Sequence, residues 1–426
     1  MKTYKLKSDL TQTPIHTSNW RATPICIPSV HKSEYKQQSY LVNPNMAMIQ
    51  CIEIDMSPAA ASLAQKSKEL QKETGLAGGL FPYGCTEKNW SAYCLAPHSF
   101  QSIGEQKVQM GLNIAGQFLH VDFHAGTADL VDPEIGDQFV STTNWVDPQT
   151  RELWFASWAM KDTFLRAAKP DMVVQGSLWK YDFKTGSLAQ IWQGETGDSL
   201  HQVSISPDKR YAVICEIGLH ARDASPVKQL YASKYLIIDM VKGREWNISV
   251  PTAAHVEFDP MEPSRCYLSS HNIGLINGKV GIFGPGKIRA CTLTPDGPVF
   301  DGEFSKDDFF RITTHVPFVH RGKTMLAVTG YPGRIFLIDP QTMALAKTID
   351  LGVTEDIELA HPPHICAKDS YGILPASDGE HLFVAQSGKM SVATIHDGRL
   401  NPWWDTDAPD ADQWCFTGHV GCLPVL

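Results

Sequence analysis

The chain has 426 residues, of which 43% are hydrophobic and 19% charged, with 32 Gly and 27 Pro. This composition is typical of a globular, turn-rich protein and excludes the collagen-like, disordered and coiled-coil classes. The 46 acidic residues outnumber the 37 basic residues, giving a net charge of -9. Nucleic acid is therefore not expected as a partner, because a phosphate backbone is bound by clustered basic side chains.

The first clear element in chain order is a helix over residues 57–75. Ser57 and Pro58 provide an N-cap and first-turn signal, helix-forming residues follow, and Gly75 provides a stop signal. Nearly all of the remaining sequence predicts strands, because short apolar or alternating runs are separated by turns containing Asp, Pro and Gly.

Predicted hairpins recur at a regular spacing. Their turn aspartates are separated by 57, 57, 43 and 58 residues and are Asp182, Asp239, Asp296, Asp339 and Asp397. A strand, a turn and another strand precede each hairpin, as in HQVSISPDKRYAVICE and HVEFDPMEPSRCYLSS. Four strands in each period of about 40 to 58 residues are the pattern of a β-propeller blade.

Further blades complete a predicted ring. Residues 139–192 contain another blade, and residues 81–123 contain a degenerate one. YLVNPN and MIQCIEIDM match the second and third strands of a last blade, with the C-terminal FTGHVGCLPVL as its first strand. We therefore predict an all-β fold in which residues 1–426 form one seven-bladed β-propeller domain with the helix as an insertion. A two-domain β protein is the alternative.

Histidines begin several predicted blades. The motif x-His-Val places His255, His315 and His419 at the same position of the innermost strand, facing the axial channel. In the preceding repeat this position is Gln202, and His201 comes directly before it. We expect only one of these two side chains to point inward, because neighbouring strand residues face opposite sides.

The last predicted repeat has Gly372 at the aligned position. The preceding loop, AHPPH, contains His361 and His364, either of which could lie over the channel mouth. Imidazoles that converge from different blades predict a metal site, because neutral imidazole is a common ligand for Fe, Zn, Cu and Mn. The alternative for each histidine is an ordinary core or surface role.

The predicted metal is a divalent transition metal, with Fe(II) favoured and Mn, Cu or Zn as alternatives. The predicted ligands are His201, His255, His315, His364 and His419. His271 and Glu358 are predicted to assist catalysis. Carboxylates that could orient the imidazole rings are Glu358, Glu257 and Glu216.

Residues 201–218, 255–274 and 315–339 resemble oligogalacturonate lyases, which are propellers whose central metal is held by His and Gln. The resemblance implies that His255 or Arg222 is the base of a β-elimination. It also implies that His315, His364 and Gln202 lie near the metal. The chain departs from this family because it has no matching basic cluster for a polyuronate and its net charge is negative.

The predicted architecture also resembles the carotenoid-cleavage oxygenases, which are seven-bladed propellers with a four-His iron site. Copper oxidases related to selenium-binding proteins offer a similar comparison. The sequence motifs of these families are not present here, so the resemblance is one of architecture. It implies an oxidoreductase or oxygenase that acts on a small organic substrate in the channel. A metal-dependent lyase and a non-catalytic protein-binding scaffold are the alternatives.

The expected location is the cytoplasm, with no membrane span. No run approaches the roughly 20 apolar residues that cross a bilayer, and the N-terminal sequence MKTYKLKSDLTQTP lacks the apolar core of a secretory signal. The ten cysteines are scattered and include no CxxC pair, which is typical of buried, reduced thiols.

Overall fold

The structure is a computed structural model, and its described residues form two helices and eight antiparallel sheets. The described residues are 2–5, 25–31, 36–43, 48–77, 80, 97–104, 107–112, 117–168, 172–197, 200–216, 229–230, 232–276, 279–331, 333–352, 372–376, 378–386, 389–405, 414–416 and 421–422. The β-rich composition predicted from the sequence is confirmed.

Seven of the sheets in these ranges contain four or more strands. One combines both ends of the chain and contains β1 (Lys2–Lys5), β2 (Ile25–His31), β3 (Lys36–Asn43), β4 (Met48–Asp55), β33 (Trp414–Phe416) and β34 (Gly421–Cys422). The next contains β5 (Pro97–Gly104), β6 (Lys107–Leu112), β7 (Phe118–Asp122) and β8 (Thr127–Val131). The third contains β9 (Gln138–Val140), β10 (Trp145–Val146), β11 (Glu152–Ala159), β12 (Val174–Asp182) and β13 (Leu188–Thr196).

The other four large sheets each have four strands. The first contains β14 (Leu200–Ile205), β15 (Tyr211–Glu216), β17 (Ala232–Asp239) and β18 (Arg244–Pro251). The second contains β19 (Ala253–Phe258), β20 (Arg265–Ser270), β23 (Lys287–Thr294) and β24 (Gly297–Ser305). The third contains β25 (Phe310–His320), β26 (Lys323–Tyr331), β27 (Arg334–Asp339) and β28 (Ala344–Asp350). The fourth contains β29 (Gly372–Pro375), β30 (His381–Gln386), β31 (Lys389–Thr394) and β32 (Leu400–Asp405).

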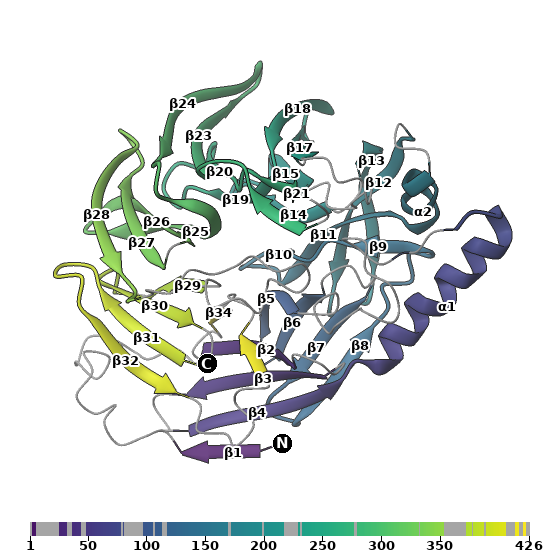
Figure 1. Ribbon diagram of the computed structural model, residues 1–426, viewed down its shortest axis with the longest axis horizontal. Helices are drawn as coiled ribbons and strands as arrows, with labels where there is room; N and C mark the ends of the chain where they lie inside the picture. Colours follow the sequence, from purple (N-terminus) through teal and green to yellow (C-terminus); the bar gives the residue numbers. More distant parts are fainter. Residues whose placement is uncertain are drawn as a thin grey trace.

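A small sheet is inserted between strands of two large ones. It contains β16 (Gln229–Leu230), β21 (Ile273–Ile276) and β22 (Lys279–Ile282). The seven larger sheets lie one after another around a common centre (Figure 1). The sheet that joins the chain ends has β2 and β34 towards the middle and β1 at its outer edge. Contacts between β10 and β14, β14 and β19, β19 and β25, and β25 and β29 link the inner strands of successive sheets. This radial arrangement is compatible with the predicted β-propeller.

Burial follows the same radial order. Every residue of β14, β15 and β20 is buried, because both faces of these strands are covered by neighbouring sheets. The outer strands β13 and β18 instead alternate between exposed and partly buried residues. The largest buried apolar cluster extends from β4 to β23. The core therefore lies between the sheets and fixes the positions of the inner strands.

The two ends of the chain meet in one sheet. β2 pairs with β33 and β34, so that Val30 lies opposite Cys415 and Ile25 lies opposite Cys422. β3 and β4 follow in the predicted order, but as the third and fourth strands of the sheet. The prediction that they were second and third was wrong, because β2 occupies the second position.

The turn aspartates lie where the repeat predicted them, between the last two strands of their sheets. The carboxylates of four of them accept the backbone N–H two residues later, from Lys184, Val241, Gln341 and Arg399. This local bond closes the turn and explains the preference for aspartate. Asp296 is the exception, since its own N–H donates to Thr294 Oγ1 over 3.2 Å.

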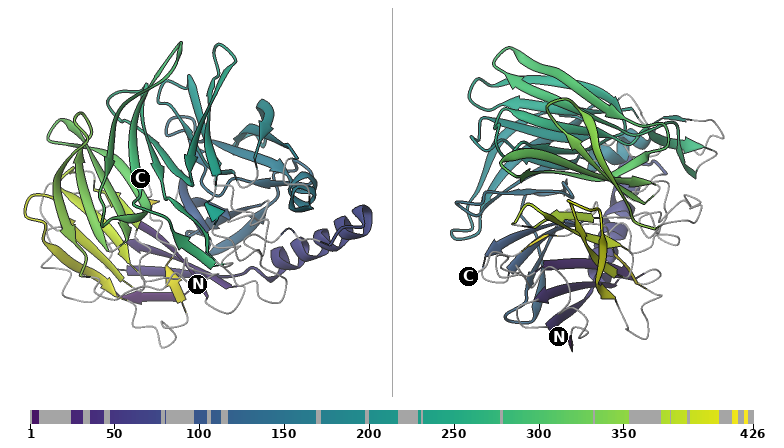
Figure 2. Two further views of the ribbon diagram at one scale, coloured as in Figure 1. Left: turned by 45° about the horizontal axis from the view of Figure 1, so that its top comes forward. Right: turned by 90° about the vertical axis from the view of Figure 1, so that its left-hand side faces the viewer.

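The predicted helix is present as α1 (Ser57–Thr74), and Gly75 ends it in the left-handed conformation with φ 69°. Ser57 is not its N-cap; its N–H and hydroxyl both donate to the carboxylate of Asp55. A second helix, α2 (Met160–Ala168), was not predicted, because it continues the apolar strand β11 without a break. Figure 2 shows α1 projecting to one side of the ring. Among the described residues, neither helix is suited in length and apolarity to crossing a membrane.

The buried carboxylate of Asp147 gives a pH-dependent prediction. Burial opposes its charge, but Lys209 and the N–H groups of Gln149 and Thr150 outweigh burial and lower the pKa of Asp147 from 3.8 to about 2. A lowered pKa contributes stability above about pH 4, and this contribution is lost as the pH falls towards 2. Because Lys209 is 38% exposed, we expect Asp147→Asn to reduce the free energy of unfolding by about 1–2 kcal/mol at pH 7.

Urea unfolding of the wild type and Asp147→Asn at several pH values between 7 and 3 tests this expectation. The difference in the free energy of unfolding should shrink on acidification. A difference that stays constant over this range would show that the carboxylate charge is not its cause.

Candidate functional site

The predicted histidine positions lie on the inner strands of three successive sheets. His201 and Gln202 are in β14, His255 is in β19 and His315 is in β25. The exposed fractions of the three histidines are only 7%, 5% and 1%. His271 follows β20 and is partly buried, and its backbone N–H donates to Thr252 O over 2.9 Å. Sequence segments that are far apart thus supply buried imidazoles to one region.

The other three imidazoles of the cluster lie around His255. Its ring centroid lies 4.9 Å from that of His201, 6.3 Å from that of His271 and 6.4 Å from that of His315. The proximity of His255 and His315, on which the sequence-based hypothesis depends, is therefore present. Burial, and then the neighbouring His255, lower the pKa of His315 to about 3.

A β-bulge explains why His201 and Gln202 act together. The pairing of β14 with β15 shifts between Leu200 and Gln202, so His201 has no partner in the ladder. Gln202 Oε1 lies 3.1 Å from His255 Nδ1, while the ring of His201 also packs on His255. Both side chains contact His255 because a bulge interrupts the alternation of strand side chains. The expectation that only one of them points into the axial channel remains a prediction.

Gln202 links His255 to a carboxylate. Its Oε1 accepts from His255 Nδ1 and from Val256 N, and its Nε2 donates to Val256 O and to Glu257 Oε1, all over 2.9–3.1 Å. Burial raises the pKa of Glu257 to about 7, although the hydrogen bond from Gln202 opposes this shift. Among the three carboxylates predicted to orient the imidazoles, Glu257 therefore acts on His255 through an amide.

His201 is held by a threonine of the preceding sheet. Thr142 Oγ1 lies 2.9 Å from His201 Nδ1 and donates its hydrogen to His201 O over 3.0 Å. Because the hydroxyl has one hydrogen, it accepts the proton of Nδ1, and Nε2 becomes the unprotonated nitrogen of His201. A parallel bridge between Thr143 and Gln202 places the neighbouring Thr142 beside β14. No sequence signal identified Thr142, since its contact depends on the packing of two sheets.

His315 has the opposite tautomer. Its Nε2 lies 2.9 Å from the carbonyl oxygen of Tyr267 and must donate to it. Its Nδ1 is therefore unprotonated, and this buried atom has no hydrogen-bond partner among the described residues. A buried nitrogen without a partner is unfavourable unless a ligand or an ion satisfies it.

The backbone of His255 is fixed from behind. Tyr235 Oη accepts from Ala254 N over 3.1 Å and lies 3.0 Å from His255 O, and it also bonds to Ser269 O. Ser269 Oγ accepts from His255 N over 3.0 Å. The inner strand that carries His255 is thus held by two buried hydroxyl groups.

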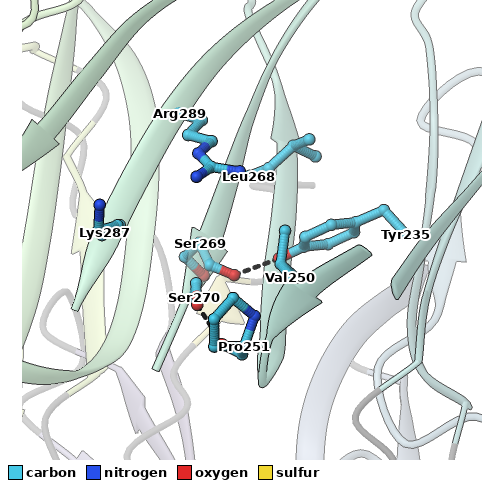
Figure 3. Close-up of a pocket in the computed structure, with 8 residues that line it drawn as sticks. All are labelled: Tyr235, Val250, Pro251, Leu268, Ser269, Ser270, Lys287 and Arg289. Carbon is cyan, nitrogen blue, oxygen red and sulfur yellow. Dashed lines mark hydrogen bonds between the residues drawn. The ribbon is translucent and has the colours of Figure 1, made fainter. Parts of the chain in front are cut away.

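A small pocket adjoins these hydroxyl groups between β17–β18 and β20–β23 (Figure 3). It is lined by Tyr235, Val250, Pro251, Leu268, Ser269, Ser270, Lys287 and Arg289. The two basic side chains of this pocket form ion pairs with the Glu303 carboxylate. The N···O distances are 2.7 Å from Lys287 and 2.8 Å from Arg289. None of the four clustered histidines lines it, so this pocket is separate from the imidazole cluster.

Some predicted site residues lie elsewhere. The contacts described for Glu216 are a hydrogen bond from Gly197 N over 2.8 Å and an ion pair with Lys234. Other predicted residues fall outside the described ranges, and these are His361, His364, His419, Glu358 and Arg222.

The imidazole spacing can be compared with that of a metal site. In the part of the chain that the structure describes, no group of three or more His, Cys, Asp or Glu side chains is placed to hold a metal ion. Two imidazoles that bind one ion at about 2.0–2.1 Å have ring centroids about 5 Å apart in tetrahedral geometry. The His201–His255 distance of 4.9 Å matches this value, whereas the distances of 6.3 and 6.4 Å exceed it. One pair therefore has the centroid spacing of tetrahedral ligands, and the other two pairs do not.

Comparisons with known proteins identify no family for this chain. No family model matches it, and no curated protein matches it. Similar solved structures include hydrazine synthase from Kuenenia stuttgartiensis, with 13% identity, 70% of this chain and 76% of that chain covered, and a TM-score of 0.44. A nidogen/laminin complex matches with 10% identity, 72% of this chain and 94% of that chain covered, and a TM-score of 0.40.

Proposed function

We propose that this protein is a metal-dependent enzyme of the cytoplasm that acts on a small organic substrate at the centre of a seven-bladed β-propeller. The seven larger sheets would be the blades, and the pairing of β2 with β33 and β34 would close the ring. The observation that carries the proposal is the convergence of His201, His255 and His315 from three successive inner strands.

The hydrogen bonds of the cluster support metal binding. Each of these histidines has one nitrogen bonded to an oxygen, from Thr142, Gln202 or the Tyr267 carbonyl. In metal sites such bonds fix the tautomer and direct the other nitrogen to the ion. The proposed ligand atoms are Nε2 of His201, Nε2 of His255 and Nδ1 of His315. His364 and His419 remain predicted ligands that would complete the set.

The proposed ion is Fe(II), with Mn, Cu or Zn as alternatives, because the ligand set is rich in imidazole and lacks thiolate. When bound, such an ion would supply O2 activation or polarisation of a substrate oxygen. The chain would supply orientation through rigid inner strands and would exclude water from the buried imidazoles. We propose oxidoreductase chemistry first.

A lyase is the second candidate, and His271 favours it. This histidine is partly buried beside His255, so it could accept a proton from a substrate carbon in an elimination. Glu358 remains a predicted helper for either reaction.

Elemental analysis of protein purified from metal-replete cells tests the proposal. We expect about one transition-metal ion per chain, as for a single ligand set. Oxygen uptake with candidate substrates would then identify an oxidase, whereas formation of an unsaturated product without oxygen uptake would identify a lyase. Folded protein without metal, which also fails to bind added Fe(II), Mn, Cu or Zn, would favour a non-catalytic scaffold and contradict the proposal.

A further inference from the structure

The amide of Gln202 has a defined orientation at the centre of the imidazole cluster. Its oxygen accepts two N–H groups, and its nitrogen donates to Val256 O and Glu257 Oε1. An amide has two acceptor sites and two hydrogens, so these four bonds use its full capacity. Rotating the amide by 180° would place its NH2 group opposite the Val256 N–H donor and its oxygen opposite the Val256 carbonyl acceptor. Both hydrogen bonds to Val256 would then be lost.

This orientation determines the proton on His255. Because Gln202 presents an acceptor oxygen to His255, the ring must carry its proton on Nδ1, and Nε2 is unprotonated. Gln202 belongs to β14 and His255 to β19, so the bond crosses between two sheets. Gln202 is only 3% exposed, so water does not compete for its hydrogen bonds.

We infer that Gln202 is a positioning residue that fixes the Nδ1–H tautomer of His255, and that Glu257 holds the amide in the required orientation. The proposal has two parts. The tautomer belongs to the metal-free protein, whereas the effect on ligand affinity rests on the proposed metal-binding function.

The first experiment measures the tautomer directly. Two-bond 1H–15N correlation spectra of full-length, metal-free protein with 15N-labelled histidine distinguish Nδ1–H from Nε2–H rings, and His255→Ala identifies the His255 signals. We expect the Nδ1–H form in the wild type. Gln202→Met, which removes the acceptor and keeps the chain length, should convert His255 largely to Nε2–H. Gln202→Glu keeps an acceptor oxygen and should restore Nδ1–H.

Glu257 and a distant glutamine provide two further comparisons. Glu257→Leu, which removes the acceptor of the amide, should yield a mixture of His255 tautomers. Gln138→Met in β9 is the matched control, because Gln138 bonds to Ser157 and to none of the clustered histidines. It should leave the His255 tautomer unchanged. An Nε2–H form in the wild type, or an unchanged Nδ1–H form in Gln202→Met, would overturn the inference.

The second experiment uses Co(II) as the metal probe, followed by its visible absorption. Gln202→Met should weaken Co(II) binding about 10–100-fold, as loss of an outer partner of a ligand does, while Gln138→Met should bind like the wild type. Wild-type protein that binds no Co(II) but has the Nδ1–H tautomer would contradict the proposed function and leave Gln202 as the positioning residue. Equal Co(II) affinity and equal tautomers in wild type and Gln202→Met would contradict the inference alone.

Discussion

His255→Ala is expected to reduce bound transition metal at least about tenfold, because loss of a ligand should weaken binding no less than loss of an outer hydrogen-bond partner. His255 is the central ring of the cluster, because the centroids of the other three imidazoles lie 4.9, 6.3 and 6.4 Å from its own centroid. Its removal would leave His201 and His315 without the ring between them. Metal per chain, determined after dialysis against buffer with a fixed free Fe(II) concentration, checks this expectation.

His120→Ala is the matched control for this variant. His120 is another partly buried imidazole, and burial lowers its pKa to about 4. It lies in β7 and packs on Phe183, which follows β12. It should lose stability without losing metal. Full metal occupancy in a folded His255→Ala protein would remove this residue from the proposed ligands, and equal losses in both variants would indicate a general effect of unfolding.

Val30→Cys is expected to form a disulfide with Cys415 under mild oxidation and to join the two ends of the chain covalently. Val30 and Cys415 lie directly opposite each other in the pairing of β2 with β33. Opposite residues of antiparallel strands have Cα distances of about 4.5–5.5 Å, which a disulfide can bridge. The bond should stabilise the fold by about 2–4 kcal/mol, because it constrains a very long segment of the unfolded chain.

Faster migration in non-reducing gels, reversed by reductant, would report the bond, and urea unfolding would report its effect on stability. Ser29→Cys is the control, because Ser29 lies opposite Phe416 and not opposite Cys415 in the pairing of β2 with β33. It should not cross-link to Cys415. Failure of Val30→Cys to react with Cys415 in folded protein would contradict the pairing of β2 with β33.

The repeat along the sequence was sufficient to predict the five hairpins whose turns carry an aspartate, and the reason is local. Aspartates such as Asp182 and Asp239 close their turns through bonds to residues two positions later, so the pattern does not depend on tertiary packing. The strand β2 and the helix α2 were missed for the opposite reason. α2 follows β11 without a turn signal, and its ends depend on packing beside β11 and β12.

The candidate site shows a similar division. The x-His-Val alignment predicted that His255 and His315 lie at matching positions, and they lie in the first strands of two successive sheets. It could not predict the bulge at His201, which depends on the pairing of β14 with β15. It also could not predict Thr142 or the Tyr267 carbonyl as partners, since these contacts cross from one sheet to another.

The sheet shared by β2, β33 and β34 has a consequence for biosynthesis. At about 5–20 residues per second, the ribosome would complete the C-terminal strands about 20–80 s after β2. During this time the edge of β2 lacks its final partners and could pair with another nascent chain. We therefore expect association between nascent chains to be favoured at this edge until β33 and β34 have emerged and paired with β2.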